Sequence, residues 1–306
     1  MGNMEKKLLV EDHIRRNKRL TIVVCTLMAL LFVGVVFSLG FIFFRGNHLI
    51  SLVFALPIAI GYIVITYSVS TQSVIAAARA RPANPQIREE KLLIYKVKEM
   101  SIAAGLPKPK VYVQDSNSIN AFATGKKPEE GVICVTTGAL RKLNQEELEG
   151  VVAHEMSHIK NYDILLATIT IAVVGAIALI SEIVFWSLLW GGAGRGGRKG
   201  EGNAIALVLA IIFIILAPIF SRLVYLAISR KREYLADSSG AYLTRNPEGL
   251  AKALERIKDD SPGQKPQGSK TVAPLYISNP FRRESAGSIW ATHPPIDERI
   301  KRLRSM

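Results

Sequence analysis

A five-residue stretch near the middle of the chain, His154-Glu155-Met156-Ser157-His158, has the residue types and spacing for metal-dependent hydrolysis. On a helix, positions i and i+4 lie about 40° apart around the axis, so both imidazoles reach one ion. They supply two adjacent ligands of a tetrahedral zinc site and leave room for a third ligand and a water. Zinc lowers the pKa of that water and polarises a peptide carbonyl. Glu155 would take the water's proton and later deliver it to the leaving amine.

The residues around this stretch predict the helix that presents it. Asn144 is a helix-capping residue type, and Glu147 follows it at the spacing of a capping box. Apolar residues mark one face of the helix, with both histidines at its edge: Leu148, Val151, Val152 and Ile159. We expect a charged amphipathic helix over 145–163. This charge argues against an intramembrane protease of the site-2 type, in which HExxH lies inside an apolar span.

A third metal ligand must come from elsewhere in the chain. His13 lies in the N-terminal tail and His48 on the far side of the predicted membrane, which leaves His293 or a carboxylate. The best carboxylate is Glu233, which follows the last apolar run. Asp237, one turn later on the same face, would accept the N–H of a ligand imidazole. The alternative for this segment is an amphipathic helix with a solvated, charged face.

Four apolar runs are long enough to cross about 30 Å of hydrocarbon as helices: 20–44, 49–70, 164–190 and 203–229. The first two contain no Asp, Glu, Lys or Arg. The last two contain one charge each, Glu182 and Arg222. Because charges in hydrocarbon are costly, buried core helices are the alternative for this second pair. A pairing of Glu182 with Arg222 would lessen that cost.

The distribution of Lys and Arg predicts the orientation of these spans. The tail 1–19 is rich in Lys and Arg, whereas the loop 45–48 carries Arg45 alone, and basic residues follow the second and fourth runs. By the positive-inside rule, the tail, both termini and the hydrophilic segments 71–163 and 230–306 are cytoplasmic. The loop 191–202 is an exception to the rule, because it carries three basic residues and must lie on the opposite side of the membrane. The third run begins six residues after His158, about 9 Å along a helix, so the metal lies close to the cytoplasmic membrane face.

The sequence therefore predicts a mainly α membrane protein: transmembrane hairpins at 20–70 and 164–229, and a cytoplasmic catalytic domain in two parts, 71–163 and 230–306. The first part contains a helix over 86–104 and short β-rich stretches at 110–114, 121–124 and 131–137, which predict a small sheet. Residues 82–85 have the composition of a linker.

Composition excludes several classes of protein. The chain has 39 Lys and Arg against 25 Asp and Glu, a net charge of +14, with a mean hydropathy of +0.23. Two distant cysteines exclude a disulfide scaffold. Aromatic residues are only 8% of the chain and no basic-aromatic motif is present, which argues against nucleic acid as a partner. We therefore expect the positive charge to face an anionic lipid bilayer.

Taken in order, the stretches HEMSH, SRKREYLAD and THPPIDERI, together with SINAFATG and the paired N-terminal spans, resemble the HtpX family of membrane-anchored zinc metallopeptidases, relatives of the CAAX prenyl proteases. The resemblance covers nearly the whole chain. It implies a zincin-like, gluzincin-type site with one zinc per chain. The ligands would be His154, His158 and Glu233, with Glu155 as base and Asp237 in support.

The same resemblance gives a meaning to two further segments. His293 and Arg299 match a C-terminal element that approaches the site in the CAAX protease relatives, and either could stabilise charge developing on the substrate oxygen. The alternative is a loop histidine and a surface arginine. The stretch Asn120, Ala121, Phe122 and Ala123 is a candidate edge strand that pairs with an extended peptide substrate, or else an ordinary short strand.

The resemblance also implies a biological role. Such proteases act in stress response and quality control, cutting misfolded or damaged inner-membrane proteins on the cytoplasmic side. Specificity for prenylated termini is less favoured, because four spans are few to enclose the large chamber of those relatives. The non-enzyme alternative is a catalytically weak membrane chaperone or scaffold that keeps the protease fold. Glu155 argues against this alternative, because loss of the base is the simplest route to inactivity.

Overall fold

The computed structural model describes residues 47–170, 230–260, 270–278 and 294–306, together with isolated positions between 12 and 37. These residues include the HExxH stretch, Glu233, Asp237 and Arg299. His293, the fourth predicted span and most of the first and third lie outside the described residues.

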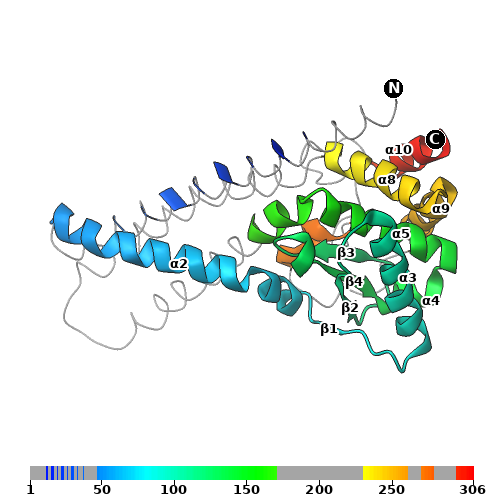
Figure 1. Ribbon diagram of the computed structural model, residues 1–306, viewed down its shortest axis with the longest axis horizontal. Helices are drawn as coiled ribbons and strands as arrows, with labels where there is room; N and C mark the ends of the chain where they lie inside the picture. The colour runs from blue at the N-terminus through cyan, green and yellow to red at the C-terminus, as the bar shows by residue number, and fades with distance from the viewer. Residues whose placement is uncertain are drawn as a thin grey trace, which may run out of the picture.

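A four-stranded sheet lies at the centre of the described domain, in the order β1-β2-β4-β3 (Figure 1). The strands are β1 Ala80–Pro82, β2 Lys110–Gln114, β3 Ala121–Thr124 and β4 Val132–Thr136. β2 and β4 are parallel, and the outer pairs β1–β2 and β3–β4 are antiparallel. The strand positions predicted at 110–114, 121–124 and 131–137 are confirmed. β1 occupies part of the predicted linker, and its Pro82 is compatible with a strand because β1 lies at an edge.

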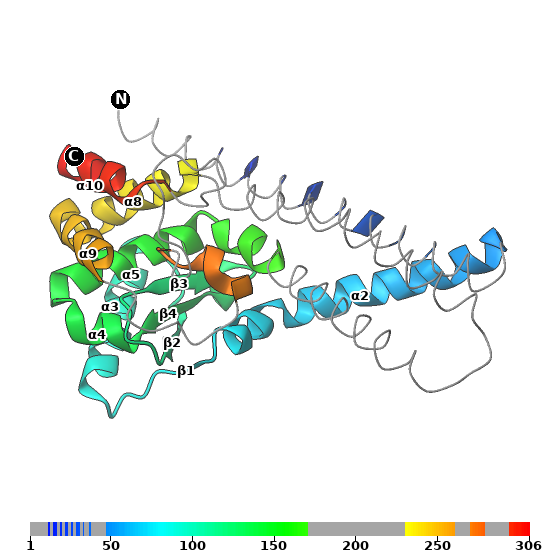
Figure 2. The ribbon, with the colours of Figure 1, turned by 180° about the vertical axis from the view of Figure 1, so that it is seen from behind.

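Helices cover one face of the sheet and form the main core (Figures 1 and 2). They are α3 Arg88–Ala104, α4 Thr137–Lys142, α5 Gln145–Lys160, α8 Arg230–Thr244, α9 Pro247–Asp259 and α10 Ile296–Arg304. Alternation along the strands sends Val113 and Ile133 into this core, and sends Phe122 and Cys134 to the opposite face. Two short 3-10 helices, η1 Pro128–Glu130 and η2 Lys270–Leu275, complete the described elements.

The HExxH helix, α5, begins as its sequence predicts and ends earlier. Asn144 and Glu147 form a reciprocal capping box, each side chain accepting from the other's backbone N–H at 2.9 Å. The helix stops at Lys160, because a turn follows in which Tyr162 has φ +59°. Residues 163–170 then form a new helical segment. The prediction of one continuous helix over 145–163 is therefore wrong at its C-terminal end.

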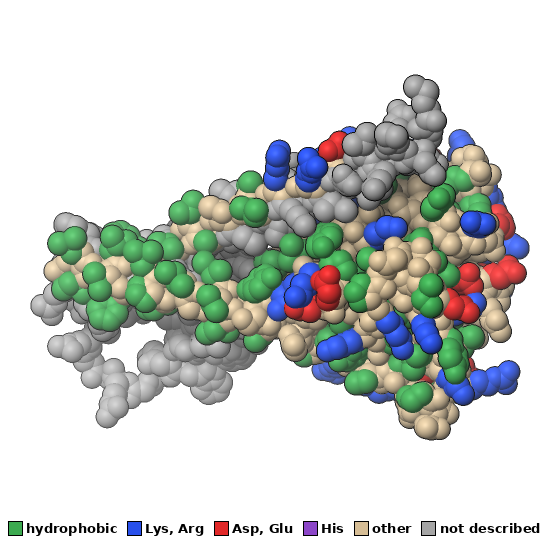
Figure 3. All heavy atoms as spheres, viewed as in Figure 1, with side chains coloured by type: hydrophobic (Ala, Val, Ile, Leu, Met, Phe, Trp, Pro, Cys, Tyr) green, Lys and Arg blue, Asp and Glu red, His purple; other side chains and the backbone are tan. Residues whose placement is uncertain are grey.

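Helix α2, His48–Ala77, extends away from the domain (Figures 1 and 2). Large apolar side chains cover its surface, as Figure 3 shows, and Leu49, Val53 and Ile65 are each more than 60% exposed. Within the described residues it is the one helix long and apolar enough to cross a membrane, over Leu49–Ala77. This segment contains the predicted run 49–70. The described residues do not bear on the other three predicted spans.

The C-terminal end of α2 packs against the domain in a second, smaller core. Its buried members lie on the sheet face opposite the main core and come from α2, β3, β4 and the segment that begins with η2: Val74, Ala78, Phe122, Cys134, Val272 and Tyr276. The apolar helix is thus joined directly to the strands that flank the HExxH helix.

Candidate metal centre

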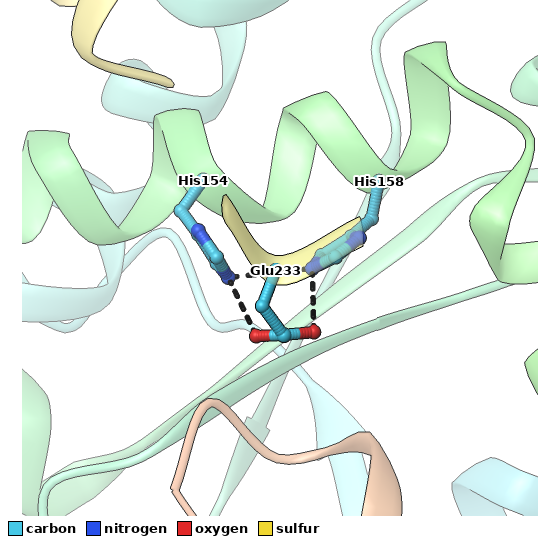
Figure 4. Close-up of side chains that lie close together, drawn as sticks. All are labelled: His154, His158 and Glu233. Carbon is cyan, nitrogen blue, oxygen red and sulfur yellow. Dashed lines mark hydrogen bonds and ion pairs between the residues drawn. The ribbon is translucent and has the colours of Figure 1, made fainter. Parts of the chain in front are cut away.

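Three side chains converge from two helices at the candidate metal centre (Figure 4). His154 and His158 project from α5, and their Nε2 atoms lie 3.3 Å apart. Glu233, in the first turn of α8, places one carboxylate oxygen 3.8 Å from His154 Nε2 and the other 3.6 Å from His158 Nε2. All three ligand atoms lie within 4.8 Å of one another. The structure therefore brings together the three residues that the sequence selected as ligands.

Two carboxylates fix the orientation of the imidazoles. Asp237 Oδ1 lies 3.0 Å from His154 Nδ1, and Asp163 Oδ2 lies 3.1 Å from His158 Nδ1. Both carboxylates therefore lie on the Nδ1 side of their rings, and both Nε2 atoms face the centre between the rings and Glu233. The donor set, two imidazoles and one carboxylate, fits zinc.

Asp163 is a site residue that the sequence interpretation missed. In the sequence it is only the last charged residue before the third apolar run, five positions after His158. The turn at Tyr162 starts a new helical segment at Asp163, which brings its carboxylate back to His158. Its position as the last acid before an apolar run was the one available signal.

The pKa values of several ionisable groups at the site are shifted by burial and by the charges of their neighbours. Burial opposes protonation of His158, but the neighbouring Asp163 and Glu233 carboxylates overcome it and raise the His158 pKa to about 9. Burial raises the pKa of Glu155, whose side chain is almost fully enclosed. Burial would also raise the pKa of Asp237, but the adjacent Arg299 guanidinium lowers it to about 2. The centre thus holds an excess of carboxylates suited to a cation.

Arg299 reaches this centre from α10 and is fully buried. It donates to both oxygens of Asp237, at 2.8 and 2.7 Å, and to the carbonyl of Ile277 at 3.2 Å. Its Nη1 also lies 3.6 Å from Glu233. The alternative of a surface arginine is therefore wrong. The geometry places Arg299 against Asp237 and Glu233, where it supports both carboxylates.

A pocket opens beside His158. Glu155 lines it, and one of its carboxylate oxygens has no hydrogen-bond partner among the described residues. The remaining lining is His158, Asp163, Arg232 and Glu233 on the polar side and Ala123, Ile164, Ala167, Pro274 and Leu275 on the apolar side. A peptide segment bound here would lie next to the proposed base.

The predicted substrate strand is β3, which does lie at an edge of the sheet. Ala123 lines the pocket. The other three residues contact the chain's own segment 276–278: Asn120 donates to the Ser278 carbonyl, Ala121 accepts from Ile277 N–H, and the Phe122 ring packs on Tyr276. The edge available to a peptide is therefore shorter than the sequence predicts.

A glycine permits the close approach of α8 to α5. A Cβ at Gly240 would lie 3.0 Å from His154 N and 3.1 Å from His154 Cα. Glu233, Asp237 and Gly240 follow each other at i, i+4 and i+7, so they share one helix face. The absence of a side chain at Gly240 is what lets both carboxylates reach the histidines.

Comparisons with known proteins identify relatives of this chain. Residues 88–306 match peptidase family M48. A protease HtpX homolog of Thermoanaerobacter pseudethanolicus is 42% identical over 305 residues, which cover 99% of each chain. A protease HtpX homolog of Streptococcus agalactiae serotype III is 41% identical over 300 residues, covering 97% of this chain and all of that one. The crystal structure of S. mikatae Ste24p aligns with a TM-score of 0.49 and 17% identity, over 89% of this chain and 61% of that chain.

Proposed function

The chain belongs to peptidase family M48 and is a membrane-associated metalloendopeptidase, and from that premise we propose the details of its activity. It is a zinc endopeptidase of the cell membrane that hydrolyses misfolded or damaged membrane proteins on the cytoplasmic side. One observation carries the proposal. Two oriented imidazoles and a carboxylate converge beside a buried glutamate that lines a pocket. The domain that holds them packs against the C-terminal end of an exposed apolar helix.

His154, His158 and Glu233 would hold the ion. Bound there, zinc supplies Lewis acidity, which lowers the pKa of a water and polarises the peptide carbonyl. Asp237 and Asp163 hold the imidazoles with Nε2 turned toward the centre. Because Arg299 is bound to Asp237 by two hydrogen bonds, we assign it to the support of this arrangement. His293 stays a prediction for stabilising the substrate oxygen.

Glu155 is the proposed general base. Its carboxylate lines the pocket next to His158, so it can take a proton from a water on one side and deliver it to a leaving amine on the other. Burial raises its pKa, and a raised pKa makes the carboxylate a better proton acceptor. Enclosure also keeps bulk water from competing for the proton.

The membrane arrangement combines the structure of α2 with the charge pattern of the sequence. α2 supplies one span, and the runs 20–44, 164–190 and 203–229 supply the other three, so that both termini and the catalytic domain are cytoplasmic. The helical segment 163–170 contributes Ile164 and Ala167 to the pocket. The third run would therefore enter the bilayer directly beside the site. The partners are the bilayer and membrane-protein substrates.

The experiment compares the full-length protein with a variant that lacks the base, both purified in detergent. The wild type should bind about one zinc per chain and degrade casein. E155Q should keep the zinc and lose proteolysis by about 10²-fold or more. E146Q makes the same change at an exposed position of α5 and should behave as the wild type.

Three results would contradict the proposal. Full proteolysis by E155Q would exclude Glu155 as the base, and wild-type protein without zinc would exclude the metal assignment. If the zinc-loaded wild type left casein intact and both proteins prevented aggregation of an unfolded protein equally well, the chaperone alternative would replace the protease.

A further inference from the structure

Two of the five apolar residues that line the pocket belong to a short segment whose position depends on its surroundings. Pro274 and Leu275, at the end of η2, line the pocket beside Glu155 and Glu233. η2 is a six-residue 3-10 helix, a form with weak hydrogen-bond geometry that is stable only in short pieces held by their surroundings. The position of Pro274 and Leu275, and with it the shape of the pocket, therefore depends on the contacts that the neighbouring residues make.

Several hydrogen bonds hold the residues directly after Leu275, including those between Asn120 and Ser278. Ile277 N–H donates to the Ala121 carbonyl of β3 at 3.0 Å, and the Ile277 carbonyl accepts from Arg299 at 3.2 Å. The first of these two bonds joins the segment to β3, and the second joins it to Arg299 at the candidate metal centre. A third bond joins the segment to β2: the Tyr276 hydroxyl donates to Oε1 of Gln114 at 2.8 Å, and the bond is buried.

Gln114 connects Tyr276 to the end of the membrane helix. It is the last residue of β2, and its Nε2 donates to the carbonyl of Ala78 at 2.8 Å. Ala78 is the C-cap of α2 and is fully buried, so its carbonyl needs a partner within the protein. A flipped amide would set Oε1 against that carbonyl, so the orientation of Gln114 is fixed. Ala78, Gln114 and Tyr276 thus form a continuous chain of buried hydrogen bonds.

The surroundings make this chain sensitive to the loss of either bond. Tyr276 and Ala78 belong to the second core, and the Tyr276 ring packs edge-on against Phe122 with ring centroids 5.2 Å apart. Tyr276 and Gln114 are each only 2% exposed, so water has little access to their polar groups as an alternative hydrogen-bond partner. In such surroundings, removal of one partner leaves the other buried polar group unsatisfied.

We propose that Gln114 and Tyr276 are positioning residues: they fix the pocket wall, Pro274 and Leu275, to the C-terminal end of α2, so that the affinity for substrate depends on the placement of the membrane helix. The inference rests on the proposed function, because it takes the pocket to be the substrate site. It predicts an effect on substrate binding and none on the metal or on the proton transfer.

The first test removes one hydroxyl. Y276F keeps the ring and its contact with Phe122 and loses the bond to Gln114. The measurement is hydrolysis of a fluorogenic apolar peptide by full-length enzyme in detergent. KM should rise about tenfold, as expected for one unsatisfied buried group, while kcat and zinc content stay within about twofold. Y112F removes a hydroxyl from a half-buried tyrosine packed on the same core and should change neither constant.

The second test needs no catalysis. Hydrogen exchange is measured over 270–278 in the wild type, Y276F, Q114M and the double variant. Both single variants should speed exchange at Ile277, even though Gln114 has no hydrogen bond to that residue. The double variant should exchange no faster than the singles, because the two side chains act through one chain of bonds.

The outcomes separate the inference from the function on which it rests. An unchanged KM together with unchanged exchange in Y276F overturns the inference. A fall in kcat and zinc content with KM unchanged also overturns it, since that result assigns Tyr276 to the metal centre. If the wild type is inactive in the same assay, the proposed function fails, and the exchange data alone decide whether Gln114 and Tyr276 hold the wall.

Discussion

The carboxylate of Asp163 shows how much a single residue can contribute to a metal site without binding the metal. It holds His158 Nδ1 at 3.1 Å and so keeps Nε2 turned to the centre. D163N should weaken zinc binding about 10- to 100-fold, because an amide orients the ring less strongly and lowers the basicity of Nε2. Titration against a competing chelator measures this change. D259N, an exposed Asp to Asn change at the end of α9, should retain wild-type affinity. Equal affinity in D163N would remove Asp163 from the site.

An ion pair between a buried glutamate and a half-buried arginine outside the site gives a second residue-level prediction. Arg81 donates to both oxygens of Glu90, and Glu90 also accepts from Asn84 N–H, which joins β1 to α3. The Arg81 bonds lower the Glu90 pKa despite its burial. A lowered folded-state pKa stabilises the protein above the unfolded value of about 4.3, and the contribution is lost as pH falls through the folded-state pKa.

E90Q should therefore lower the free energy of unfolding at pH 7 by about 1–2 kcal/mol, a figure reduced because Arg81 is 40% exposed. The difference between E90Q and the wild type should shrink steadily below pH 4. Chemical unfolding in detergent between pH 7 and pH 3 measures it, with the exposed E89Q as the control. A difference that stays constant with pH would contradict the titration of Glu90.

At the scale of elements, the packing of α8 on α5 decides whether the ligands meet. In G240A, the new methyl would lie 3.0–3.1 Å from the His154 backbone, so α8 must move by a few tenths of an ångström and carry Glu233 with it. We expect at least tenfold weaker zinc binding, because ligand positions tolerate little displacement. G61A, in open space on α2, is the matched control and should bind zinc normally. Normal zinc affinity in G240A would mean that the two helices adjust without displacing Glu233.

Local chemistry explains which elements the sequence could predict. The start of α5 depends on Asn144 and Glu147, which lie three residues apart, and the strand at 110–114 was predicted from a two-residue alternation. The placement of Glu233 could be predicted because the two apolar runs between His158 and Glu233 would form a hairpin that returns the chain to the same membrane surface. Each of these features is encoded within a short stretch or by hydropathy alone.

The remaining features depend on contacts between distant segments. In the turn after α5, Tyr162 has φ +59°. This conformation is uncommon for tyrosine, so the sequence does not predict it. The return of Asp163 to His158 was missed for that reason. Arg299 is buried because α10 packs against α8. Its partner on α8, Asp237, lies 62 residues earlier in the sequence. The covering of the β3 edge by 276–278 likewise joins segments more than 150 residues apart.

At the scale of the whole molecule, the position of the pocket relative to the bilayer follows from α2. Leu49 to Tyr67 is about 27 Å along the helix, close to the thickness of the hydrocarbon core. Tyrosine is common at the membrane interface, and Lys126 lies 4.9 Å from the Tyr67 ring, so a bilayer crossed by α2 would have the β3–η1 loop at the level of its headgroups. Ala123 lines the pocket three residues before Lys126, which is at most about 10 Å along the chain.

This geometry predicts that the enzyme cuts membrane proteins close to where their chains leave the bilayer. The test uses substrates in which one transmembrane helix is followed by a Gly-Ser linker of 2 to 30 residues and then one cleavable segment, reconstituted with the enzyme in vesicles. An extended chain covers about 3.3–3.6 Å per residue, so linkers of about five residues should already permit cleavage. Longer linkers should lower the rate only gradually, as the effective concentration falls. E155Q in the same vesicles gives the background. A requirement for about 12 or more linker residues would place the pocket at least 40 Å from the bilayer, and would contradict the position of the pocket at the foot of α2.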